Sequence, residues 1–259
     1  PSGLPVATLR GVLKRMNRFQ VCLLITTALC LLGTTPTLNA DIRTRLEAYR
    51  EALGDADALD DLRSLRLQGT ITQGDAEVRF LVYKKEPALL RREVTLPSGK
   101  TLVQVSGDTG QWQWVRGMDA SVPEPITGTP ADFLLAQASM YGPLLGEDGD
   151  PARGFDYIDM VTLPHLDRQA HHLRAGRETG EVIDAYLDHF TDRLIELHYR
   201  PTADAPPVEM RFGDFRDVEG LTFPHRIEYW FRGELLSVAE ISQIDVNFSV
   251  YSFFFRRPR

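Results

Sequence analysis

Residues 65–115 read LRLQGTITQGDAEVRFLVYKKEPALLRREVTLPSGKTLVQVSGDTGQWQWV, and this stretch decides the fold. Apolar and polar side chains alternate within it, so that Val78, Phe80 and Val82 share one side of the chain. A period of two is typical of β-strands with two distinct faces. We therefore predict five strands within this stretch.

Turn residues separate these strands, at Gly74-Asp75, Pro97-Ser98-Gly99 and Gly107-Asp108-Thr109-Gly110. Glycine supplies the positive φ that tight hairpins need. The stretch therefore predicts an up-and-down antiparallel sheet. A sheet of this kind either packs over a solid core or curls around a cavity that holds an apolar ligand.

The same alternation continues in the second half of the chain. It predicts strands near residues 158–163, 168–175, 181–188, 193–200, 207–215, 223–232 and 234–246. Together with the five earlier strands this makes roughly a dozen, which predicts a mainly β fold. The aromatic tail at residues 251–255 is expected to form a last strand or to tuck into the rim of a barrel.

Two helices are predicted as well. Residues 41–53 carry an apolar stripe at helical spacing, with Asp41 as the expected N-cap. A second helix is expected over residues 129–140, because Thr129 is a good N-cap and Pro130 suits the first helical position. This inserted helix either plugs one end of a barrel or forms a movable lid over a ligand cavity.

The first forty residues differ from the rest. Residues 21–32 are almost unbroken apolar chain after a short basic segment, and small residues follow up to Ala40. This pattern predicts a signal peptide at residues 16–40 with cleavage after Ala40, preceded by an upstream segment at 1–15. A transmembrane anchor is the alternative, but the apolar run is shorter than the roughly 20 residues that span a bilayer. We therefore expect a periplasmic protein with a single domain at residues 41–259.

Cysteine and charge narrow the possible functions. Both cysteines, Cys22 and Cys30, lie in the predicted signal peptide, which excludes disulfides and thiolate chemistry from residues 41–259. Four of the 29 basic residues and none of the 36 acidic ones precede residue 41, so the remainder carries 25 against 36, a net charge of −11. Such an acidic domain is a poor partner for nucleic acid or for anionic membranes.

Motifs for catalysis or metal binding do not emerge. The histidines form no HxH, HExxH or HxxEH set, and we expect surface or rim histidines rather than a zinc site. His171 and His172 are adjacent on a predicted strand and should point to opposite faces. The sequence also has no nucleophile elbow, phosphate-binding loop or dinucleotide fingerprint. We therefore predict a binding protein without catalytic residues, cofactor or metal.

Large apolar side chains on the strands and on the inserted helix are the candidates for a cavity lining. Trp112 and Trp114 share one face of their strand, as Tyr229 and Phe231 do, whereas Trp230 faces the other way. A shift of one register would invert half of this set. The candidates are Phe80, Val82, Trp112, Trp114, Phe133, Leu134, Tyr229 and Phe231.

The order of these segments resembles the periplasmic lipoprotein-carrier superfamily, known as LolA-like or outer-membrane lipoprotein-sorting proteins. The matching segments cover nearly all of residues 41–259, although each is short. They are a signal peptide, a helix ending at residues 49–54, residues 65–69, residues 80–87 with Arg91 and Arg92, the turn at 108–112, the helix at 129–135, and residues 185–188, 214–220, 223–224 and 247–258.

The resemblance implies an incomplete antiparallel β-barrel with helices covering its opening, and the strand pattern above gives it about eleven or twelve strands. It also implies that acyl chains of lipoproteins or another lipid bind in a hydrophobic cavity, with inner- and outer-membrane lipoprotein machinery as partners; we expect a monomer. In the carrier proper an arginine just before the proline of the second strand holds the lid shut. This chain departs from that pattern with Glu86, and its candidates for the polar rim are Arg91 and Arg92.

Three alternatives stay open. The first is a carrier of a glycolipid or an isoprenoid-like ligand. The second is a small-molecule enzyme, which would need a compact cluster of carboxylates or histidines inside the cavity. The third is an envelope-stress or assembly module that uses the outer surface of the sheet, and its interior should be packed solid.

Overall fold

The computed structural model describes residues 37–117, 122–146, 154–176 and 180–257, without the side chains of residues 37–40, 129, 132 and 133. The described residues from Asn39 onward form one compact unit. The predicted signal peptide therefore lies almost entirely outside the described residues. Among the described helices, none has both the length and the apolar character that a bilayer span requires.

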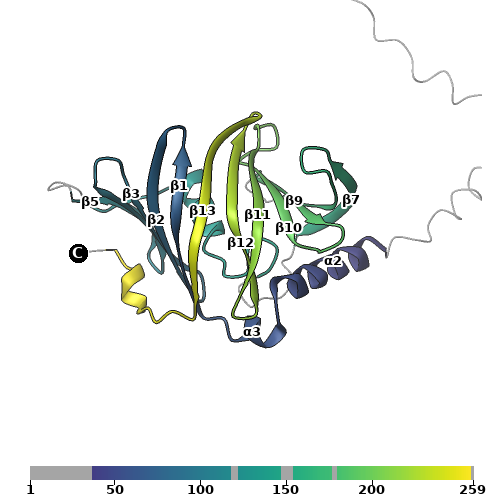
Figure 1. Cartoon of the computed structure of the whole chain (residues 1–259), viewed down its shortest axis with the longest axis horizontal. Helices are drawn as coiled ribbons and strands as arrows, with labels where there is room; N and C mark the ends of the chain where they lie inside the picture. The colour runs from purple at the N-terminus through teal and green to yellow at the C-terminus, as the bar shows by residue number, and fades with distance from the viewer. Residues whose placement is uncertain (1–36, 118–121, 147–153, 177–179, 258–259) are drawn as a thin grey trace, which may run out of the picture. The chain divides into compact units, whose positions relative to one another are not determined.

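The thirteen strands of the described residues belong to one antiparallel sheet in the order β6-β5-β4-β3-β2-β1-β13-β12-β11-β10-β9-β8-β7 (Figure 1). Their bounds are β1 Ser64–Gln73, β2 Ala76–Lys85, β3 Leu89–Thr95, β4 Thr101–Gly107, β5 Gly110–Arg116, β6 Glu124–Pro125, β7 Phe155–Leu163, β8 Arg168–Gly176, β9 Val182–Asp188, β10 Leu194–Arg200, β11 Val208–Val218, β12 Leu221–Phe231 and β13 Glu234–Val246. Strands that follow one another in the chain are neighbours except at β6 and β7, and β1 pairs with β13. Because β6 and β7 are not paired with each other, the sheet is not closed.

The predicted mainly β, incomplete-barrel architecture is confirmed. The described residues contain thirteen strands, close to the expected number of about eleven or twelve. The additional element, β6, has only two residues, which is too short to leave an alternation in the sequence. Hairpin turns lie where the glycines predicted them, with positive φ at Gly74, Gly99 and Gly110. A bulge in the β1–β13 pairing lies at Gly69, where a Cβ atom would meet the carbonyl oxygen of Glu240 at 2.0 Å.

The N-terminal helix covers part of the sheet (Figure 1). Helix α2 runs from Thr37 to Leu53, so the expectation that it begins at an Asp41 cap is wrong. No glycine or proline interrupts residues 37–40, and the helix therefore extends backward. Its predicted stripe is buried in the main core, with Leu46 3% and Tyr49 4% exposed. The short helix α3, Ala56–Asp60, follows and buries Leu59.

The inserted helix is shorter than predicted. Helix α4 spans Thr129–Ala136, whereas residues up to Met140 were expected to be helical. The chain continues from α4 without helical structure, and Gly142 takes a φ of 81°. Within this stretch Ser139 Oγ donates a hydrogen bond to the carbonyl oxygen of Gly142 at 2.8 Å. We call residues 137–143 the post-α4 segment.

The C-terminal tail forms a 3-10 helix, η1 Ser252–Phe255, instead of a strand. Phe255 is 1% exposed and packs with Leu89, Val103 and Val105. Phe253 remains 65% exposed, so part of the aromatic tail is in contact with solvent. The tail lies against β3 and β4.

Candidate functional site

The alternation of side chains gives the sheet an inner and an outer face. We define the inner face as the one that carries Phe80, Leu90, Leu197 and Tyr229, and the outer face as its reverse. Helix α2, helix α3 and the post-α4 segment cover the inner face, because their residues share a cavity wall with it.

A cavity of about 520 Å³ lies between the inner face and these covering segments. Its volume falls within the roughly 300–1,000 Å³ of typical ligand pockets. The wall is predominantly aliphatic and aromatic. Contributors include Tyr49 and Leu53 from α2, Leu59 from α3, Leu65 and Ile71 from β1, Met210 and Phe212 from β11, and Ile241 from β13.

Three of the predicted cavity residues line this cavity: Phe80, Val82 and Tyr229. Arg92, predicted for the polar rim, also lines it. These residues share the inner face because Val82 pairs with Arg92 across β2 and β3.

The structure places Trp112 and Trp114 on the outer face, which corrects their prediction as cavity residues. Trp112 pairs with Val105 and Trp114 with Val103, and both valines are buried under the C-terminal tail. The apolar face here is the outer one, covered by the tail, whereas the inner face carries Gln104 and Gln113, so the aromatic pair alone did not reveal which face is inner. The guanidinium of Arg257 lies 4.5 Å from the centre of the Trp112 ring.

Arg91 also lies on the outer face, so its assignment to the cavity rim is wrong. Its guanidinium lies 4.2 Å from the centre of the Phe254 ring, and Arg91 pairs with Glu93 at 2.7 Å. Adjacent residues of a strand point to opposite faces, so Arg91 and Arg92 cannot share one rim.

The remaining candidates do not line the cavity. Leu134 is 2% exposed but packs in a separate cluster with Leu90 and Ile126. Phe231 is the last residue of β12, where the chain turns toward β13, and it is absent from the cavity wall. The side chain of Phe133 lies outside the described residues.

Basic side chains interrupt the apolar wall. Lys84, Arg92 and Arg193 line the cavity, and no aspartate or glutamate does so among the described residues. Sequence reasoning missed Lys84 as a wall residue. The signal was available, because Phe80, Val82 and Lys84 continue the period of two along β2.

Among the described residues, the two cations on β2 and β3 have only neutral hydrogen-bond partners. Lys84 Nζ donates to the carbonyl oxygen of Ser139 at 2.8 Å. Arg92 Nε donates to Gln104 Oε1 at 3.1 Å and Arg92 Nη1 to Gln137 Oε1 at 3.5 Å. Burial lowers the pKa of Lys84 to about 8, and burial also lowers the pKa of Arg92. Both cations therefore hold the post-α4 segment at a cost in desolvation.

We expect a characteristic pH dependence from Lys84. Its pKa is about 8 in the folded chain and about 10.4 when unfolded, so between these values the unfolded chain binds more protons and stability rises with pH. In urea unfolding of lipid-free protein, the wild type should gain stability over Lys84→Met by on the order of 1 kcal/mol per pH unit near pH 9. Lys85→Met, which removes a lysine from the outer face, is the matched control. Parallel pH profiles for the wild type and Lys84→Met would contradict this prediction.

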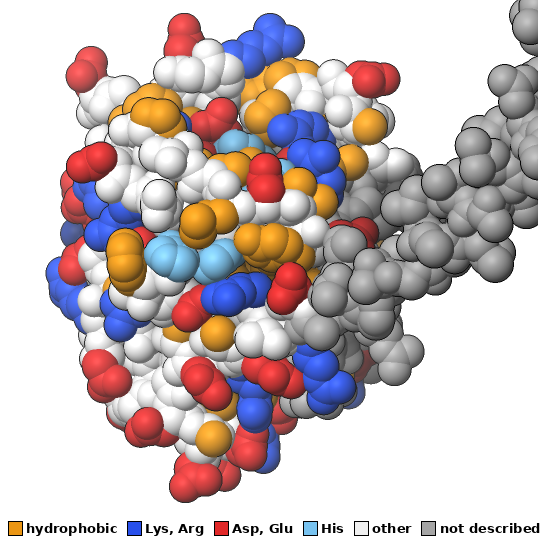
Figure 2. Space-filling view, turned by 90° about the vertical axis from the view of Figure 1, so that its right-hand side faces the viewer, with side chains coloured by type: hydrophobic (Ala, Val, Ile, Leu, Met, Phe, Trp, Pro, Cys, Tyr) orange, Lys and Arg blue, Asp and Glu red, His pale blue; other side chains and the backbone are white. Residues whose placement is uncertain are grey.

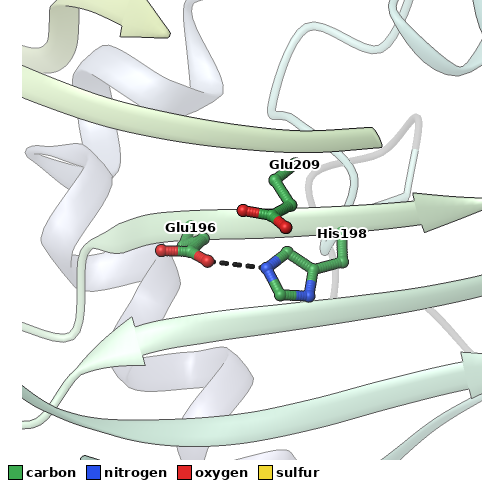
Figure 3. Close-up of side chains that lie close together, drawn as sticks. All are labelled: Glu196, His198 and Glu209. Atoms are coloured by element: carbon green, nitrogen blue, oxygen red, sulfur yellow. Dashed lines mark hydrogen bonds and ion pairs between the residues drawn. The ribbon is translucent and has the colours of Figure 1, made fainter. Parts of the chain in front are cut away.

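A compact group of carboxylates and histidines lies on the outer face. Ligand atoms of Glu196, His198 and Glu209 all lie within 4.8 Å of one another, and the three side chains come from β10 and β11 (Figure 3). Glu196 is 1% exposed, and its oxygens lie 2.6 Å from Nε2 of His198 and of His165. Burial alone would raise the pKa of Glu196, but the hydrogen bonds from His198 and His165 outweigh it and lower the pKa.

This group has the composition of a metal site, which sequence spacing did not reveal because Glu209 comes from the next strand. A cation already occupies the neighbourhood, however. Arg211 Nη2 lies 3.0 Å from Glu209, and Arg211 Nε lies 3.6 Å from Glu196. The guanidinium of Arg211 therefore balances part of the charge of the two carboxylates. The group lies on the opposite face from the cavity, so it is not the interior cluster that a cavity enzyme would need.

The prediction that the histidines lie at the surface or rim is wrong for three of them. His171 is 5%, His172 8% and His225 6% exposed. As predicted, His171 and His172 face opposite ways: His171 Nε2 lies 3.2 Å from Arg45 of α2, whereas His172 Nε2 lies 2.8 Å from Asp184 on β9. Figure 2 shows that some histidine side chains still reach the surface, among hydrophobic and charged groups.

Comparisons with known proteins support the fold alone. No family model matches the sequence, and no curated protein matches it. A LolA superfamily protein from Nitrosomonas europaea has 15% sequence identity and a TM-score of 0.52, over 82% of this chain and 96% of that one. A putative outer membrane lipoprotein-sorting protein domain from Vibrio parahaemolyticus has 10% identity and a TM-score of 0.52, over 81% and 95%.

A third solved structure, a DUF1329 family protein from Desulfovibrio piger, has 13% identity and a TM-score of 0.54, over 83% of this chain and 97% of that one. All three matches extend over almost the whole length of the known protein. Together with the open thirteen-stranded sheet and its covering helices, they give this chain the LolA-like fold.

Proposed function

We propose that the chain is a periplasmic carrier or chaperone that binds the acyl chains of lipoproteins or of another lipid. The observation that carries this proposal is the apolar cavity of about 520 Å³ under the covering segments. Burying an acyl chain contributes about 0.8 kcal/mol per methylene group, so a cavity of this character supplies ample binding energy. The lipoprotein-sorting name of one structural neighbour agrees with this class of ligand.

The proposed movable element is the post-α4 segment, not helix α4 itself. Leu134 of α4 is packed in its own cluster and does not line the cavity. Gln137, Ser139 and Met140 do line it, and Lys84 ties the segment to β2 through the Ser139 carbonyl. A single hydrogen bond from a partly desolvated lysine is a contact that a ligand can replace.

The other properties follow from the same proposal. The carrier would reach the periplasm through the signal peptide at 16–40 and act as a monomer without catalytic residues or cofactor. Its partners would be a lipid or lipid-modified protein and the inner- and outer-membrane lipoprotein machinery. The assembly-module alternative expects a solid interior, and the enzyme alternative expects the carboxylate and histidine group inside the cavity. The position of the cavity and of that group disfavours both.

A cavity-blocking variant tests the proposal. Ile71 lines the cavity from β1, whereas its neighbour Thr72 is exposed on the other side of the strand. Wild type, Ile71→Trp and Thr72→Trp are isolated from a membrane-containing lysate, and bound lipid is quantified by native mass spectrometry. We expect lipid on the wild type and on Thr72→Trp, and at least about tenfold less on Ile71→Trp, because the indole fills the cavity.

The proposal fails if the wild type carries no lipid, or if Ile71→Trp carries as much as Thr72→Trp. Far-ultraviolet circular dichroism of both variants checks that they are folded. Mass analysis of the same exported protein also identifies its first residue, which we expect to be Asp41.

A further inference from the structure

We propose that the cavity ligand is an anionic amphiphile, an acyl lipid with a carboxylate or phosphate group, and that this group binds between Lys84 and Arg92. The inference rests on the proposed lipid-binding function and adds the chemical class of the ligand. It follows from the charges on the wall, since the described lining residues include three basic side chains and no acidic one.

Lys84 and Arg92 lie close together on the inner face. Arg92 pairs with Val82 on β2, and Lys84 is two residues further along the same strand. This makes Lys84 and Arg92 diagonal cross-strand neighbours, about 7–8 Å apart at Cα and within reach of each other's long side chains. Both also contact the post-α4 segment, Lys84 at Ser139 and Arg92 at Gln137. They therefore form one basic site beneath that segment.

Without a counter-ion among the described residues, the two cations of this basic site carry an unfavourable desolvation free energy. A buried charge without an opposite charge carries a desolvation penalty that neutral hydrogen bonds repay only in part. Lys84 has a backbone carbonyl as its partner, and Arg92 has the amides of Gln104 and Gln137. The lowered pKa of Lys84 has the same cause. A carboxylate or phosphate would pair with both cations, and arginine can bind either group through two hydrogen bonds.

The neighbouring lysine shows the difference between a structural contact and this site. Lys85 Nζ donates to the carbonyl oxygen of Val250 at 2.7 Å, much as Lys84 donates to Ser139, but Lys85 belongs to the outer face. If Lys84 and Arg92 served only to hold the post-α4 segment closed, their loss would weaken the binding of all cavity ligands by the same factor. If they bind an anionic group, their loss weakens anionic ligands selectively.

The test compares two ligands that differ only in the head group. Hexadecanoic acid and hexadecanol compete for the cavity against the neutral fluorophore Nile red at pH 7, with hexadecyl phosphate and inorganic phosphate as further arms. We expect the acid and the alkyl phosphate to displace Nile red from the wild type at least about tenfold better than the alcohol. Inorganic phosphate at millimolar concentration should displace nothing, because the apolar chain supplies most of the affinity.

The double variant Lys84→Gln/Arg92→Gln should lose the preference for the acid over the alcohol, whereas Lys85→Gln should keep that preference. Equal affinity for acid and alcohol in the wild type, or a preference that persists in the double variant, overturns the inference and leaves the lipid carrier intact. A wild type that binds Nile red and none of the lipids overturns both the inference and the proposed function.

Discussion

Replacing Asp184 with alanine is expected to destabilise the folded protein by about 3 kcal/mol, because the substitution breaks a buried ionic group. Asp184 is fully buried on the outer face. Its carboxylate accepts hydrogen bonds from His172 Nε2 at 2.8 Å, from Arg174 and from Arg200. Without it these donors lose their shared anion while the backbone still holds them together. Urea unfolding at pH 7 measures the change in free energy.

Asp159→Ala is the matched control, since Asp159 also contacts His172 but its side chain is 57% exposed. An exposed ion pair contributes at most about 1 kcal/mol to stability. The free energy of unfolding of this control should therefore remain close to that of the wild type. Equal losses for Asp184→Ala and Asp159→Ala would contradict the assignment of Asp184 as a structural anion.

The carboxylate of Asp184 also makes the stability of the fold depend on pH in the acid range. Burial alone would raise the pKa of Asp184, but the hydrogen bonds from His172, Arg174 and Arg200 outweigh it and hold the pKa well below its ordinary value. A depressed carboxyl pKa stabilises the fold above the unfolded pKa of about 3.9, and this contribution is lost as the pH falls below that value. The difference in free energy of unfolding between the wild type and Asp184→Ala should therefore become smaller below pH 4.

The second large effect is expected at Phe255. Phe255→Ala should cost about 3–5 kcal/mol, the usual range for removing a buried phenylalanine. The ring is 1% exposed and fills the outer face over Leu89, Val103 and Val105. The chain passes so close that a Cβ atom at Gly107 would lie 2.2 Å from the carbonyl oxygen of Phe255. Thermal and urea unfolding both measure this loss.

Phe253 provides the control within the same turn of η1, because its ring is 65% exposed. Phe253→Ala should change stability by less than about 0.5 kcal/mol. Since Phe255 lies on the outer face, Phe255→Ala in its folded form should bind cavity ligands as the wild type does. A large loss for Phe253→Ala, or none for Phe255→Ala, would contradict the packing of the tail.

The strands could be predicted from the sequence because alternation and turn residues agreed. The last strand was expected at residues 234–246, and β13 has those bounds. Gly74, Gly99 and Gly110 have the positive φ that placed the hairpins. Local patterns therefore sufficed for the order of the elements and for the mainly β class.

The inner face could be predicted only in part, and the reason is physical. Around β4 and β5 the outer face is covered by Phe255, so Trp112 and Trp114 are apolar for a reason unrelated to the cavity. Alternation tells two faces apart only where one of them meets water. Lys84 was not predicted to line the cavity, because a charged side chain was not expected in an apolar wall.

The β1–β13 pairing has a consequence for how the molecule assembles. Arg66 of β1 and Asp245 of β13 are joined by an ion pair at 2.6 Å, although 179 positions separate them along the chain. Every other pair of neighbouring strands consists of strands that are consecutive in the chain. Most of the sheet can therefore form from local contacts, early in folding. Until β13 pairs with its two neighbours, however, β1 and β12 are unpaired sheet edges. The two parts of the cavity wall on either side of β13 are then not joined. During folding these edges present unpaired backbone groups to other strands, and the cavity wall is complete only once β13 has paired with both.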